Sequence, residues 1–97
     1  MNHATFQINL VPHSIRTVEG SMIVKIDARD DVLVLNPVAA TILSGLKERE
    51  GSSVSISDLL GDIKQKFDVE DISEDVLTAD IQRTLDLFVE KGLIRHK

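Results

Sequence analysis

This chain of 97 residues contains no cysteine, tryptophan or tyrosine, and its aromatic side chains are limited to three phenylalanines. The absence of cysteine excludes a disulfide framework and a thiolate metal site. The scarcity of aromatic rings removes the stacking platforms on which single-stranded nucleic acid binds. The core must therefore be built mainly from the Ile, Leu, Val and Ala side chains of a chain that is 42% apolar.

Basic residues are also few. The chain has 11 Lys and Arg and 16 Asp and Glu, which gives a net charge of −5. This balance argues against a nucleic-acid partner, since binding to phosphates requires clustered cations. No apolar run approaches the roughly 20 residues of a membrane-spanning helix, and the N-terminus lacks the features of a signal peptide. We expect one cytoplasmic domain over residues 1–97, with no membrane partner.

Groups that carry catalysis or bind metals are not gathered by the sequence. His3, His13 and His96 are scattered, without the i, i+4 spacing that brings two ligands to one helix face. The serines have no basic partner at a spacing that suggests a nucleophile. We therefore expect no enzyme, no metal and no cofactor, and we interpret the acidic residues near positions 30 and 68–75 as structural.

The N-terminal half has the alternation and turn residues of strands. Residues 5–12 alternate apolar and polar side chains until Pro12, so residues 1–13 are an ordered arm or an extra strand. Three antiparallel strands are predicted next, at residues 15–18, 22–27 and 31–35, joined by turns at Glu19-Gly20-Ser21 and Ala28-Arg29-Asp30. The last of these strands is apolar on both faces, which suggests that both of its faces are covered.

Three helices follow these strands. The first is expected over 37–47, with Asn36 as its N-cap and Pro37 at its first position. In the second, Ser55 and Asp58 have the spacing of a capping box, and Val54 and Leu59 that of a hydrophobic staple. The third is expected from Ser73 to Lys91, where Gly92 ends it in the left-handed conformation.

Two sets of side chains run along the third helix. The main stripe is typical of a core, and its members are Leu77, Ile81, Thr84, Leu85 and Phe88. The adjoining flank mixes apolar and charged side chains, and its members are Val76, Asp80, Arg83 and Leu87. Together the elements predict an α+β fold like a winged helix-turn-helix, with a three-stranded antiparallel sheet followed by three helices.

The segment VLVLNPVAATIL and the helix DVLTADIQRTLDLFVEKGLI carry a family resemblance over roughly residues 15–95. With the intervening VSISDLL and IKQKFDV, the chain resembles the PqqD-like proteins, also called RiPP recognition elements. The resemblance implies a peptide chaperone that binds the leader of a ribosomally made precursor peptide. The leader lies as an extra strand on the third strand, beside the third helix, and is presented to a radical SAM or other maturation enzyme.

A peptide-binding site is therefore predicted between strand 31–35 and the flank of the third helix. Its residues are Val32, Leu33, Val34, Leu35, Val76, Asp80, Arg83, Thr84 and Leu87. Arg83 is suited to an acidic leader residue and Asp80 to a basic one, although the two are also spaced to pair with each other on a solvated face. The opposite flank, around Gln82 and Val89, is the geometric alternative.

Two other functions fit the same pattern of elements. A winged-helix transcription regulator would place the third helix in the major groove of DNA, but that helix is acidic. A small scaffold subunit would use the free strand edge to dimerise. The sequence leaves the oligomeric state open.

Overall fold

The computed structural model describes residues 5–27 and 32–96, so the predicted turn at Ala28-Arg29-Asp30 lies outside the described residues. His3 and Asp31 lie outside them as well. The elements in chain order are β1 Thr5–Leu10, β2 His13–Val18, β3 Ser21–Ile26, β4 Val32–Leu35, α1 Pro37–Glu48, β5 Ser53–Ser55, α2 Ile56–Lys66, α3 Glu74–Glu90 and β6 Ile94–His96.

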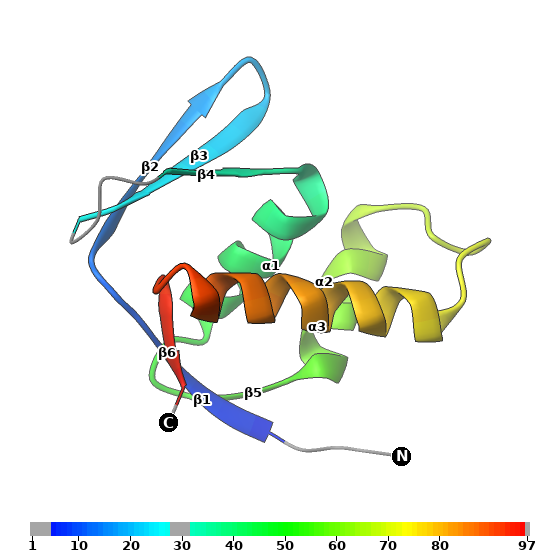
Figure 1. Cartoon of the computed structure of the whole chain (residues 1–97). Helices are drawn as coiled ribbons and strands as arrows, with labels where there is room; N and C mark the ends of the chain where they lie inside the picture. Colours follow the sequence, from blue (N-terminus) through cyan, green and yellow to red (C-terminus); the bar gives the residue numbers. More distant parts are fainter. Residues whose placement is uncertain (1–4, 28–31, 97) are drawn as a thin grey trace.

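Strands β2, β3 and β4 form a three-stranded antiparallel sheet with β3 in the centre, and three helices follow it in the sequence (Figure 1). The predicted α+β class and its order of elements are confirmed. The β2–β3 turn is tighter than predicted, because Ser21 already pairs with Val18 and leaves Glu19 and Gly20 in the turn. Both turn residues have positive φ, which Gly20 adopts without steric cost.

A second three-stranded sheet, which we did not predict, has β1 at its centre. The first half of β1 pairs with β5, and the second half pairs with β6 at the C-terminal end of the chain. Residues 5–10 are thus a strand, and they pair in a different sheet from β2, β3 and β4. We missed β5 and β6 because each has three residues and forms only where β1 provides a partner.

The helix ends follow the predicted capping chemistry. The Asn36 side chain accepts a hydrogen bond from the Ala39 amide at 2.8 Å at the start of α1. Ser55 and Asp58 form the reciprocal bonds of a capping box at the start of α2. After α3, Gly92 has a φ of 80° and the Leu93 amide donates to the Phe88 carbonyl at 2.9 Å.

One core joins the sheet β2-β3-β4 to the helices. Its fully buried side chains come from the strands and from all three helices. The largest of them are Phe88, Ile42, Leu43, Leu46, Leu59 and Ile63. Val54 and Leu59, the predicted staple, are both buried. The hairpin formed by β2 and β3 extends beyond the helices at the top of Figure 1.

Helices α1 and α2 approach each other closely at Gly45. A Cβ at this position would lie 2.4 Å from Asp62 Oδ2, so a larger residue would displace that carboxylate. Asp62 accepts two hydrogen bonds from the Arg49 guanidinium, at 2.7 and 3.0 Å. The hydrogen bond to Asp62 raises the pKa of Arg49 above its ordinary value, so the half-buried guanidinium stays charged.

Candidate functional site

Strand β4 pairs with β3 along all four of its residues. On its other side it pairs with no strand within the described part of the chain, and we call this side the open edge of β4. Strand β1 does not occupy the open edge, because it pairs with β5 and β6. Unpaired backbone N–H and C=O groups at such an edge are a template for another extended segment.

The two faces of β4 have different surroundings, so the expectation that both are covered is wrong for the chain alone. Leu33 and Leu35 point into the core and are buried. Val32 and Val34 point to the opposite face and are 53% and 67% exposed. Of the predicted peptide-binding residues, Leu33 and Leu35 therefore have side chains that are used in the core, whereas Val32 and Val34 offer theirs to a partner.

The predicted flank of α3 lies at the border between core and solvent. Val76 and Leu87 are exposed, while Asp80 and Thr84 are half-buried. Arg83 donates to Asp80 Oδ1 at 3.0 Å, which is the self-pairing that the spacing also allowed. The Thr84 hydroxyl donates to the Asp80 carbonyl at 2.9 Å, so it is used within the helix. The flank thus offers two apolar side chains next to an exposed ion pair.

The position of α2 distinguishes the two flanks of α3. Glu74 at the start of α3 forms an ion pair with Lys64 of α2. At about 100° per residue, Val89 lies roughly 60° around the helix from Glu74, whereas Val76 lies roughly 160° away. The flank of Gln82 and Val89 therefore shares its side with α2, and the flank of Val76 and Leu87 points elsewhere.

Helix α1 is the element that relates β4 to α3. It follows β4 directly through Asn36 and packs against β4, α2 and α3. In the described chain, β4 and α3 do not form one of the major packing contacts with each other. Helix α1 thus packs against both the strand with the open edge and the helix with the predicted flank.

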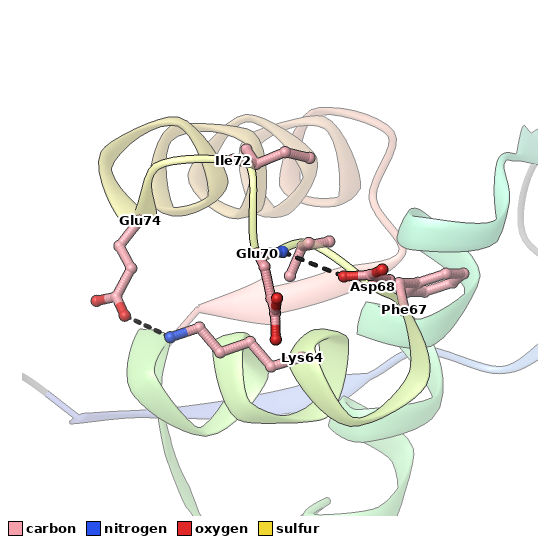
Figure 2. A pocket seen from close by; sticks show the side chains of 7 residues that line it. Lys64, Phe67, Asp68, Glu70, Ile72 and Glu74 are labelled. Carbon is pink, nitrogen blue, oxygen red and sulfur yellow. Dashed lines mark hydrogen bonds and ion pairs between the residues drawn. The ribbon is translucent and has the colours of Figure 1, made fainter.

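A separate hollow of about 490 Å³ lies where α2 leads into α3. Figure 2 shows Lys64 of α2 meeting Glu74 of α3 across it, with Glu70 on the connecting loop. Asp68 accepts from the Glu70 amide at 3.4 Å and shapes this loop. The charged side chains that line this hollow link α2 to α3, which agrees with a structural role for residues 68–75.

Other chemistry has little support in the described part of the chain. Residues 5–27 and 32–96 contain no group of three His, Cys, Asp or Glu side chains placed to hold a metal ion. His13 Nδ1 lies 2.7 Å from the Val11 carbonyl oxygen. Because a carbonyl oxygen can only accept a hydrogen bond, Nδ1 is the donor. None of the described helices combines the length and the apolar character that crossing a bilayer requires.

The acidic character of α3 also weakens the transcription-regulator interpretation. Within Glu74–Glu90, Arg83 is the single basic residue, and its guanidinium pairs with Asp80. A helix that enters the major groove makes hydrogen bonds to bases and contacts to phosphates, both of which favour cations. Helix α3 lacks the positive charge that such contacts favour.

Residues 22–94 match the family described as coenzyme PQQ synthesis protein D (PqqD). The matched range begins in β3 and ends in β6, so it includes β4 and all three helices. No curated protein and no solved structure matches the chain.

Proposed function

This chain belongs to the PqqD family, and from that membership we propose that it is a non-enzymatic module that binds the leader of a ribosomally made precursor peptide. The leader adds a strand to the open edge of β4, and the module presents the bound peptide to a radical SAM or other maturation enzyme in the cytoplasm. The family description connects the chain with the synthesis of coenzyme PQQ.

The observation that carries this proposal is the contrast between β4 and β1. Strand β4 has an edge to which a visiting segment can pair, while the chain's own N-terminal strand is held in the other sheet. An edge already paired with β1 would leave no place for a guest. Strand addition to β4 therefore needs no prior unfolding of the N-terminal strand.

Backbone pairing alone is too weak to hold the leader. Four residues of β4 can form about four hydrogen bonds, each contributing about 1 kcal/mol net. Association costs roughly 4–15 kcal/mol in lost motion. Side-chain burial must supply the difference, and the flank of α3 offers Val76 and Leu87 for it. In this proposal Arg83 exchanges its pairing with Asp80 for a contact with an acidic leader residue.

The test is a titration of the full chain with the labelled leader of a short precursor peptide, which is first sought among the genes next to its own. A leader of the same composition in shuffled order is the control. We expect the native leader to bind at least tenfold more tightly, because alternating side chains must match the positions beside β4 and α3. Equal binding of the two peptides would overturn the proposal.

Strand addition itself is tested by leaders that carry one N-methyl group at successive positions. In a strand, N–H groups point alternately toward and away from the neighbouring strand. We expect affinity to fall at every second position across the bound segment and to be kept at the positions between. A loss at consecutive positions, or at none, would exclude pairing with β4.

A further inference from the structure

The main-chain groups of a strand alternate in direction, and the pairing register shows which of them reach the open edge of β4. In an antiparallel pair, the N–H and C=O of one residue point toward the partner strand, and those of the next residue point away from it. Strand β3 pairs with β2 on one side and with β4 on the other. The direction of one β3 residue therefore fixes the direction of every residue in β4.

The end of the β2–β3 hairpin away from its turn fixes this direction. Beyond the last register pair, His13 with Ile26, the Asp27 amide donates to the Pro12 carbonyl at 3.1 Å. Asp27 therefore points its main-chain groups toward β2. Every second residue before it in β3 does the same, and these residues are Ser21, Ile23 and Lys25.

The turn of the hairpin gives the same direction. Glu19 and Gly20 both have positive φ, which is the conformation of a type I′ turn. Such a two-residue turn is closed by a hydrogen-bonded pair, here Val18 and Ser21. Ser21 again points its main-chain groups toward β2, so two separate observations agree.

The direction in β4 follows from that in β3. The β3 residues that alternate with the three above, and therefore point toward β4, are Met22 and Val24. Their register partners are Leu35 and Leu33, which bond to β3. Val32 and Val34 lie opposite β3 residues that point toward β2, so their own N–H and C=O groups point to the open edge.

The open edge of β4 thus offers the main-chain groups of Val32 and Val34, and not those of the two leucines. Asn36, which follows β4, uses its carbonyl to accept from the Ala40 amide at 2.9 Å, so it cannot complete a further pair. The side chains of Val32 and Val34 are also exposed. A segment that bonds to these two residues therefore meets their side chains as well.

An antiparallel guest uses these groups with the shortest segment. A guest residue opposite each valine exchanges two hydrogen bonds with it, so about three consecutive residues use all four groups. In a parallel pair the bonds of one residue are shared between two partners, so about five guest residues would be needed. The parallel arrangement is also slightly less stable per residue.

We infer that two leader residues, two positions apart, pair antiparallel with Val32 and Val34 and bury the two valine side chains. The inference rests on the proposed function and adds to it the sequence class of the leader. Directly opposed residues have their side chains on the same face, and valine is matched there by β-branched or aromatic side chains. The leader residue between them turns its side chain to the face on which Leu33 is buried, and its N–H points away from β4.

Hydrogen exchange of the unmodified chain, followed by NMR, tests the main-chain assignment before any guest is added. We expect the Val32 and Val34 amides to exchange at least about tenfold faster than those of Leu33 and Leu35, because only the leucine amides bond to β3. The labelled leader of the titration above should then slow exchange at both valines by about tenfold or more. Slow exchange at the valines in the free chain, or bound leader that leaves them unprotected, would overturn the inference.

Double-mutant cycles test the pairing. Val34→Lys is combined with leaders that carry glutamate at successive positions. We expect affinity to exceed the product of the separate effects by roughly two- to fivefold at one position, which is also a position where an N-methyl group weakens binding. Val32→Lys should move this gain two positions toward the leader's C-terminus, because the two strands run in opposite directions.

Val18→Lys is the matched control, since Val18 is an exposed valine on β2, two strands away from the open edge. It should give no gain with any leader, and circular dichroism checks that all three variants are folded. A gain at a position that tolerates N-methylation, or a shift toward the leader's N-terminus, would overturn the inference. Failure of the leader to bind the unmodified chain would count against the proposed function instead.

Discussion

The two sheets of this protein differ in how their edges are used. In the sheet β5-β1-β6, the longest strand lies in the centre and its neighbours have three residues each. In the sheet β2-β3-β4, the centre is β3, and within the described residues both outer strands, β2 and β4, have one unpaired side, which in β4 runs along four residues. The first arrangement joins β1 and β6, which lie near the two ends of the chain, and the second leaves a template for a visiting strand. Position within a sheet, more than strand sequence, separates a structural strand from a candidate binding strand.

The largest expected difference is between one valine from each sheet. Val54 in β5 is fully buried, so Val54→Asp should lower the free energy of unfolding by about 3–5 kcal/mol because it buries an unpaired charge. Val34→Asp in β4 should change it by less than about 0.5 kcal/mol, because that side chain is exposed. Urea denaturation measures both.

The same pair of variants separates stability from binding. We expect Val34→Asp to weaken leader binding roughly tenfold while the chain stays folded. A stable Val54→Asp protein would show that the β5-β1-β6 sheet is dispensable. Unaltered leader binding by Val34→Asp would place the guest away from β4.

A second comparison concerns the two flanks of α3. Leu87→Ala should weaken leader binding roughly tenfold, because it removes apolar contact area on the flank that points away from α2. Val89→Ala is the matched control on the other flank, and it should change the affinity less than about twofold. Fluorescence anisotropy with the labelled leader measures both. The reverse result would assign the site to the flank of Gln82 and Val89.

A third comparison uses the two junctions at which a strand leads directly into a helix. Asn36→Ala removes the N-cap after β4, and Ser55→Ala removes the N-cap after β5. Each should lower the free energy of unfolding by about 1 kcal/mol in urea denaturation. Only Asn36→Ala should also weaken leader binding, since it loosens the end of β4. Equal effects on the leader would remove the distinction between the two sheets.

The smallest expected effect belongs to the ion pair on α3. Arg83→Ala removes the exposed pair with Asp80 and should cost only about 0.3 kcal/mol in thermal or urea unfolding. Leader affinity should fall severalfold at low ionic strength, and the difference from the unmodified chain should shrink as salt is added. Arg83→Lys keeps the charge and is the control. A loss of leader affinity that does not depend on salt would rule out a charge contact by Arg83.

Much of the fold could be predicted because its determinants are local. The cap at Asn36, the capping box of Ser55 and Asp58, and the left-handed Gly92 each depend on groups within a few residues. Alternation in residues 5–12 correctly indicated a strand at β1. The prediction for β4 was wrong where it required cover on both faces, because apolar character alone does not reveal which face a neighbour covers.

The site residues remain predictions, and the structure sorts them by what they can offer. The side chains of Leu33 and Leu35 belong to the core, and those of Val32 and Val34 lie on the exposed face of β4. The side chains of Val76 and Leu87 lie on the flank of α3 that points away from α2. No sequence signal separated these roles, since all six are ordinary apolar residues.

The sequence by itself determined the helices, their ends and the antiparallel hairpin, because short-range hydrogen bonds and alternation encode them. Tertiary structure alone decided which sheet receives the N-terminal strand and that β4 keeps an open edge. Backbone N–H and C=O groups are the same in every strand, so their pairing depends on where packing brings distant segments together. Strand β1 joins β5 and β6 across most of the chain length, and that choice leaves β4 available.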